Sequence, residues 1–276
     1  MFKRIIARLD IKNGSLVKGI NLEGLRNLGD PDYFSKIYYD HGIDEIHFQD
    51  VVASLYNRDV LFKIVEKNSK KIFVNVSAGG GIRNEKEVDN LLRVGVDKVV
   101  INSAAVKNPL FLKKLVNKYG SSTIAVAIES NKIDNKYEVL IETGRERTGL
   151  ELFEWVKKIQ SFGVGEIIVT DISREGKNKG FNIELYEKLR PKVFVQLIAH
   201  GGAGPLDNIV NLFNLSDVDG ISVASLFHYN YLKKNLDSQL KGNNFFLQTF
   251  EDTDKKGTNI KDLKNYLKSK NIKVRL

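Results

Sequence analysis

The chain has 276 residues, of which 42% are hydrophobic and 28% are charged, and it contains no cysteine. These values argue against a disordered, collagen-like or coiled-coil chain, and the lack of cysteine excludes disulfides, thiolate catalysis and cysteine-ligated metal sites. The net charge is +9, but residues 233–276 alone carry 11 Lys and Arg against 5 Asp and Glu, and no basic run is interleaved with aromatic residues. We therefore expect no nucleic-acid partner. No apolar run is long enough for a signal peptide or a membrane span, so we expect a cytoplasmic protein without a membrane partner.

Eight short apolar runs alternate with stretches of helical length along the chain. In chain order the predicted strands are Arg4–Asp10, Glu45–Asp50, Ile72–Ser77, Lys98–Asn102, Thr123–Glu129, Glu166–Asp171, Phe194–Ala199 and Gly220–Ala224. Eight strands, each followed by a helix, fit a closed parallel (β/α)₈ barrel in a chain of this length. We predict one α/β domain over residues 1–276, with another doubly wound sheet as the alternative.

The two halves of the chain repeat one another at an offset of about 120 residues, as internal repeats do. The matched positions are Asp10 with Glu129, Glu45 with Glu166, Ala78–Gly81 with His200–Ala203, and Asp97 with Asp219. This correspondence predicts a barrel built from two half-barrels of four strands, whereas chance alignment of common β/α patterns is the alternative.

Glycine-rich turns follow matching strands in the two halves, at Gly79–Gly81 and Gly201–Gly204. Glycine lets backbone N–H groups approach an anion closely, and in a barrel such turns lie at the C-terminal face, where phosphate sites form. Nearby strand ends are Asn102-Ser103 and Ala224-Ser225. The pair of turns predicts a substrate with a phosphate at each end, although each turn alone could be a plain tight turn.

Charged residues mark both ends of the predicted strands. Asp10 and Glu129 end the first and fifth strands, across one barrel mouth, which suits a general acid and a general base. The alternative is that these carboxylates only cap the next loop. At the strand starts, Arg4, Glu45, Lys98 and Glu166 could form a ring of salt bridges across the N-terminal face, where a structural role is the default.

Segments along almost the whole chain resemble the cyclase subunit of imidazole glycerol phosphate synthase. They are residues 3–14 (Lys-Arg-Ile-Ile-Ala-Arg-Leu-Asp-Ile-Lys-Asn-Gly), 16–19, 29–31, 79–82, 101–106, 201–204, 224–228 and the terminal Asn-Ile-Lys-Val-Arg-Leu. Only residues 236–258 look like an insertion, before the last helix. The resemblance implies a (β/α)₈ barrel that receives ammonia from a glutaminase docked on its base and uses it on a bis-phosphorylated ribulosyl intermediate.

The resemblance also assigns roles to residues of this chain. It places catalytic carboxylates at Asp10 and Glu129, and an ammonia gate at Arg4, Glu45, Lys98 and Glu166. We expect no metal or other cofactor. The predicted substrate- and phosphate-binding residues are Lys18, Gly80, Gly81, Asn102, Ser103, Thr170, Gly176, Gly201, Gly202, Ala224 and Ser225.

Several residues depart from the family pattern. Glu129 replaces an aspartate, Arg8 replaces a cysteine, His200 replaces a serine, and the segment after the sixth strand reads Asp171-Ile-Ser-Arg-Glu-Gly-Lys177. We interpret His200 as a hydrogen-bonded histidine rather than a proton carrier. These changes, with residues 47–56 and 199–204, resemble a second group of cyclase-like proteins from bacterial surface-polysaccharide loci.

Proteins of that second group work beside a glutaminase-like protein and an N-acetyl sugar amidotransferase. We therefore predict an ammonia-passing paralogue that acts with a phosphorylated sugar-type substrate. The alternatives are the histidine-pathway cyclase subunit and a non-catalytic scaffold that only activates the glutaminase.

Overall fold

A computed structural model describes residues 1–52, 59–234 and 257–276. Its parallel strands close into a barrel, since β7 pairs with both β6 and β10, and β12 pairs with β1. In order around the barrel they are β1 (Arg4–Lys12), β4 (Glu45–Asp50), β5 (Asn75–Gly79), β6 (Lys98–Ile101), β7 (Ile124–Ile133), β10 (Glu166–Asp171), β11 (Gln196–His200) and β12 (Gly220–Val223). The predicted (β/α)₈ barrel is confirmed.

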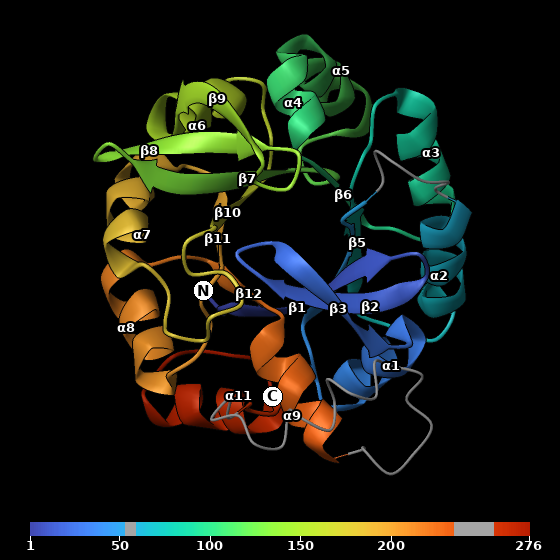
Figure 1. Cartoon of the computed structure of the whole chain (residues 1–276), viewed down its shortest axis with the longest axis vertical. Helices are drawn as coiled ribbons and strands as arrows, with labels where there is room; N and C mark the ends of the chain where they lie inside the picture. The colour runs from blue at the N-terminus through green and yellow to red at the C-terminus, as the bar shows by residue number, and fades with distance from the viewer. Residues whose placement is uncertain (53–58, 235–256) are drawn as a thin grey trace.

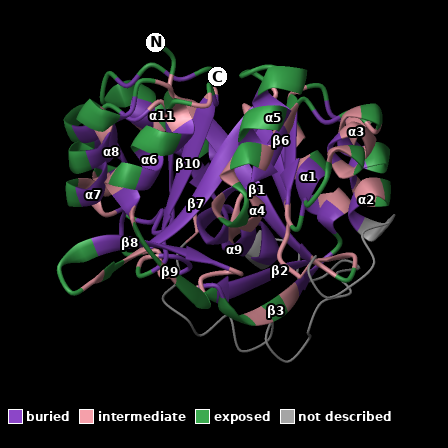
Figure 2. Cartoon of the chain, turned by 90° about the horizontal axis from the view of Figure 1, so that it is seen from above, coloured by how far each residue is buried: buried purple, intermediate pink, exposed green. Residues whose placement is uncertain are grey.

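Helices surround this barrel, and their exposed faces point outward (Figures 1 and 2). They are α1 (Pro31–Asp40), α2 (Asp59–Ser69), α3 (Glu85–Arg93), α4 (Ser103–Lys107), α5 (Pro109–Tyr119), α6 (Leu152–Gln160), α7 (Ile183–Leu189), the 3₁₀ turn η1 (Arg190–Lys192), α8 (Leu206–Ser216), α9 (Ser225–Lys234) and α11 (Ile260–Ser269). Side-chain hydrogen bonds to main-chain amides cap the N-termini of several of these helices. At α1, for example, Asp30 accepts a hydrogen bond from the Asp32 amide at 2.9 Å and Pro31 begins the helix.

The strands are buried on both faces, which explains why they appear in the sequence as nearly continuous apolar runs. In β1, the residues Ile5, Ala7 and Leu9 belong to the large core shared with the helices. Ile6 belongs instead to a small inner cluster with Val100, Ala125, Ala127, Ile168 and Ile198. Above and below that cluster the inner positions are polar, and these positions build the site.

Two antiparallel hairpins that the sequence analysis did not predict extend the barrel. β2 (Ser15–Ile20) and β3 (Glu23–Gly29) continue from β1, and β8 (Lys136–Ile141) and β9 (Glu146–Glu151) continue from β7. Figure 2 shows both hairpins at the end of the barrel opposite the two termini. Because β1 and β7 open the two repeated halves, the hairpins add a further correspondence to the predicted repeat.

Two predicted strand starts are wrong because an exposed phenylalanine lies before the strand. β5 begins at Asn75 rather than Ile72, and β11 begins at Gln196 rather than Phe194. The predicted insertion at 236–258, except its last two residues, and positions 53–56 of the second-group motif lie outside the described residues. In the part of the chain that is described, no helix is long and apolar enough to cross a membrane.

Candidate active site

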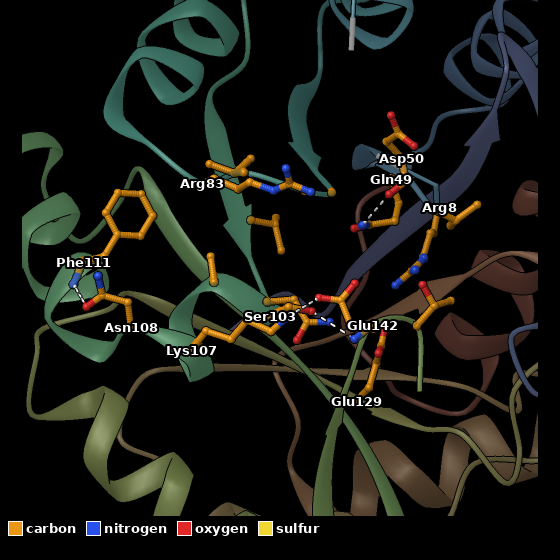
Figure 3. A pocket seen from close by; sticks show the side chains of 18 residues that line it. Arg8, Gln49, Asp50, Arg83, Ser103, Lys107, Asn108, Phe111, Glu129 and Glu142 are labelled. Atoms are coloured by element: carbon orange, nitrogen blue, oxygen red, sulfur yellow. Dashed lines mark hydrogen bonds and ion pairs between the residues drawn. The ribbon is translucent and has the colours of Figure 1, made fainter. Parts of the chain in front are cut away.

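A cavity of about 380 Å³ lies at the C-terminal ends of the barrel strands in the first half of the chain (Figure 3). Five of the predicted site residues line it, namely Gly80, Gly81, Asn102, Ser103 and Glu129. Other side chains around it include Arg8, Gln49, Arg83, Lys107, Phe111 and Glu142. Three of the lining residues, Arg8, Arg83 and Lys107, are cationic, and three, Asp50, Glu129 and Glu142, are carboxylates, so the cavity offers charges of both signs to a ligand.

The glycine turn that follows β5 approaches the end of β4 too closely for any side chain. A Cβ at Gly80 would lie 2.2 Å from the Asp50 carbonyl oxygen, and Gly80 and Gly81 have φ values of +109° and +59°. In the second half, a Cβ at Gly201 would lie 2.5 Å from the carbonyl oxygen of Asp171. Both turns therefore require glycine for the same reason, at the first position after the strand in each half.

Asp10 lies at the end of the barrel strand β1 within a buried chain of charges. Arg8 Nε donates to its Oδ1 at 2.8 Å, and Lys18 Nζ lies 3.5 Å from its Oδ2. Burial opposes ionisation, but Arg8 and Lys18 outweigh it and hold the pKa of Asp10 far below its usual range. Asp10 therefore stays an anion at neutral pH.

Glu129, the matching carboxylate of the second half, has the opposite electrostatic environment. Its Oε2 accepts a hydrogen bond from the Gly144 amide at 2.9 Å, and Figure 3 shows the side chain beside the cavity. Burial raises its pKa to about 7, against the lowering effect of Arg8. Two carboxylates whose pKa values are driven apart in this way can act as a fixed charge and a proton-transfer group.

The predicted substrate lysine, Lys18 on β2, is buried against Glu175 from the loop after β10. The main-chain oxygen of Glu175 accepts a hydrogen bond from the Asn21 amide at 3.0 Å. The side chain of Glu175 accepts one from the Leu22 amide at 3.2 Å. A Cβ at Gly176 would lie 2.4 Å from the Gly19 carbonyl oxygen. These contacts fasten the β2–β3 hairpin to the β10–α7 loop, and Lys18 is not among the residues that line the cavity.

The second predicted phosphate site forms a separate group beneath the same β10–α7 loop. Ser225 Oγ donates to Asn178 Oδ1 at 2.5 Å, and the Gly180 amide donates to the Gly202 carbonyl oxygen at 2.8 Å. The other members of this set are also buried. Thr170 is on β10, Gly201 follows β11 directly, and Ala224 follows β12 directly. The structure thus brings the predicted phosphate-binding residues together in two groups, and only the first borders the cavity described above.

The four predicted gate residues meet at the opposite, N-terminal end of the barrel. Arg4 contacts Glu45 at 2.9 Å and also pairs with Glu166, while Lys98 lies 3.0 Å from Glu166 and 3.6 Å from Glu45. Burial favours the neutral form of both carboxyls. Lys98 and Arg4 nevertheless lower the pKa of Glu166, whereas the pKa of Glu45 remains raised.

Two buried histidines belong to the barrel strands β4 and β11. His200 Nδ1 donates to the Ser222 carbonyl oxygen at 2.8 Å, which agrees with its interpretation as a hydrogen-bonded residue, and burial lowers its pKa. His47, which the sequence analysis placed only within a motif, contacts Ser77 and Gln49. Among the described residues, no group of three or more His, Asp and Glu side chains could hold a metal ion.

Comparisons with known proteins give one consistent family. Residues 4–233 match the model of the family described as "Histidine biosynthesis protein". The chain is 41% identical, over 228 residues, to the imidazole glycerol phosphate synthase subunit HisF of Bacillus cereus strain ATCC 10987 / NRS 248, and equally to that of strain Q1. Each match covers 82% of this chain and 90% of the relative. The relatives agree better with the alternative prediction, the cyclase subunit, than with the predicted role in sugar amidation.

Proposed function

Because the chain belongs to the histidine biosynthesis protein family and is related to the HisF subunit of imidazole glycerol phosphate synthase, we propose that it is an ammonia-dependent cyclase subunit. It would accept ammonia from a glutaminase at the N-terminal end of the barrel. It would use that ammonia on a phosphorylated sugar-type substrate in the cavity at the C-terminal end. The first candidate reaction is that of imidazole glycerol phosphate synthase, the enzyme to which its relatives belong.

One observation carries this proposal: the ring of Arg4, Glu45, Lys98 and Glu166 and the cavity lie at opposite ends of the same barrel interior. The ring can face a partner that supplies a small nucleophile. The cavity offers glycine turns and cations for an anionic substrate, with Glu129 at its edge. This division of tasks fits a synthase subunit better than a barrel that binds and converts one ligand at a single end.

Exposed aromatic side chains surround the ring and support a protein partner there. Phe2, Phe73 and Phe194 each lie two residues before a barrel strand, at β1, β5 and β11, and are 54%, 78% and 86% exposed. Single exposed apolar residues are ordinary, but aromatic residues at equivalent positions around one face are typical of a contact surface. We assign this face to the glutaminase.

The proposed chemistry divides the two carboxylates. Glu129, with its pKa near 7, would transfer protons to and from the substrate, and the permanently charged Asp10 would stabilise positive charge that develops during the reaction. The Gly80–Gly81 turn, Ser103 and Lys107 would hold one phosphate. No step of this scheme requires a metal or other cofactor.

The test is turnover of the bis-phosphorylated ribulosyl intermediate by the purified chain with an ammonium salt, and with glutamine plus the co-expressed glutaminase. We expect both reactions in the natural protein, and a loss of at least ~10²-fold in the Glu129→Gln variant. Glu184→Gln, which removes an exposed carboxylate on α7 outside the cavity, is the matched control and should retain most of the activity. Absence of turnover with either ammonia source would refute the cyclase assignment.

Sugar amidation is a second candidate function, and the Arg8–Asp10 ion pair favours it. A buried cation in the middle of the barrel engages the carboxylate that the resemblance makes catalytic. In this case the chain would pass ammonia on to an N-acetyl sugar amidotransferase. Glutamine-dependent amidation in a reconstituted trio, without turnover of the ribulosyl intermediate, would establish that role. Stimulation of the glutaminase without ammonia transfer would indicate a scaffold.

A further inference from the structure

A line of hydrogen bonds inside the barrel connects the charged ring to the cavity. Ser77 Oγ lies 2.8 Å from Glu45 Oε1 and 3.1 Å from His47 Nδ1, and His47 Nε2 lies 3.0 Å from Gln49 Oε1. Glu45, His47 and Gln49 are alternate residues of β4, and Ser77 is the β5 partner of His47. Glu45 belongs to the ring and Gln49 lines the cavity.

These three hydrogen bonds require three protons. Ser77 supplies one, a neutral imidazole supplies one, and an ionised carboxylate supplies none. The amide of Gln49 cannot supply the third in this orientation, because its Nε2 donates to the Asp50 carbonyl oxygen at 3.3 Å and its Oε1 faces the histidine. A reversed amide would place its oxygen against the Asp50 carbonyl oxygen, another acceptor. In the orientation that avoids this contact, an additional proton resides on Glu45 or on His47.

We propose that Glu45, Ser77 and His47 share this additional proton, that it rests on Glu45, and that it gives the ring a net positive charge. The ring then holds two cations, Arg4 and Lys98, against one anion, Glu166. Such a ring repels ammonium and other cations while neutral ammonia passes. This inference rests on the proposed function, because it assigns the ring a task in ammonia entry.

The charges around each end of the line favour the proton on Glu45. His47 lies beside Arg8 on the neighbouring strand, and Asp10 and Glu166 lie farther along the barrel. Burial and then Arg8 lower the pKa of His47 to about 4, against the opposing influence of Gln49, Asp10 and Glu166. Around Glu45, burial and Glu166 favour the protonated carboxyl, while Lys98, Arg4 and Ser77 oppose it, and the balance raises its pKa.

Transfer of the proton along the line is balanced. The Glu45 O–H bond breaks as a new O–H bond forms at Ser77, whose own proton passes to His47 Nδ1. The products are an ionised Glu45 and a charged His47, again with three protons for three hydrogen bonds. This state returns the ring to zero net charge, so the position of one proton sets its electrostatic barrier.

The experiment uses the full chain alone, without glutaminase or substrate. Infrared difference spectra between the natural protein and Glu45→Gln should show a protonated carboxyl at pH 7. In His47→Val, Ser77 can donate to an ionised Glu45, so the pH at which this absorption disappears should fall by about one unit or more. His200→Ser removes a buried histidine outside the line and is the matched control. It should leave the absorption at pH 7.

The ¹⁵N chemical shifts of His47 provide a second measurement and should show a neutral ring with its proton on Nε2 at pH 7. A charged ring, or an ionised Glu45 at pH 7, would overturn the proposal. Because no glutaminase is present, failure of the proposed function would leave these spectra unchanged. The two ideas can therefore fail separately.

Discussion

Glu129 should make the stability of the protein depend on pH in a specific window. Its pKa is raised from an ordinary 4.5 to about 7 in the folded protein. As the pH rises from 4.5 to 7, the unfolded chain loses this proton while the folded chain keeps it. At 1.36 kcal/mol per pH unit, the free energy of unfolding should fall by about 3 kcal/mol over this window. The contribution is fully present below pH 4.5 and is lost as the pH rises through 7.

The Glu129→Gln variant isolates this effect, because it keeps the side-chain shape and cannot ionise. We would measure urea unfolding of the natural protein and the variant at half-unit steps between pH 4 and pH 8 and subtract the two free energies of unfolding. The contributions of all other titrating groups then cancel. The natural protein should lose about 3 kcal/mol relative to the variant between pH 4.5 and pH 7. A difference that stays constant across this window would refute the burial argument for Glu129.

Three further predictions concern other parts of the site. Arg8→Met should lower the free energy of unfolding by about 3–5 kcal/mol, because it leaves Asp10 buried without its nearest cation. The double variant Arg8→Met/Asp10→Asn should recover much of that loss, and urea unfolding of both variants measures the difference. Gly80→Ala should weaken phosphate binding, measured by calorimetry, because its Cβ meets the Asp50 carbonyl oxygen; unaltered affinity would contradict the assigned turn. Phe194→Ser should weaken glutaminase association about tenfold or more in a pull-down titration, whereas Leu110→Ser, an exposed apolar residue on α5, should not.

The barrel strands could be predicted because they are buried on both faces, but the two hairpins were missed. Their strands are only partly apolar, although the turns that lead into β2 and β8 are recognisable. Asn13-Gly14, between β1 and β2, and Asp134-Asn135, between β7 and β8, have positive φ throughout, and such pairs are strong hairpin signals. Exposed phenylalanines caused the opposite error at Phe73 and Phe194, since hydrophobicity alone does not tell a buried strand residue from an exposed residue before the strand.

The candidate site could be located from the sequence, but its electrostatics could not. The repeat places Asp10 and Glu129 at equivalent strand ends, which predicts similar roles. Arg8 has no equivalent cation in the second half, where Ala127 lies two residues before Glu129, and this difference sets the two pKa values apart. The Lys18–Glu175 contact joins residues 157 positions apart, so only the folded chain brings them together.

The fastening of the β2–β3 hairpin by Lys18 and Glu175 determines how a ligand can enter and leave. Both side chains are almost completely buried. Lifting this hairpin therefore means breaking their ion pair and the hydrogen bonds from the Asn21 and Leu22 amides to Glu175 in one step. Ligand exchange should therefore take the other side of the mouth, between the Glu142–Thr143 turn and the start of α5. There Lys107 and Glu142 form a partly exposed ion pair, and water can solvate both side chains when the pair separates. The release rate of product should depend on how readily this ion pair opens.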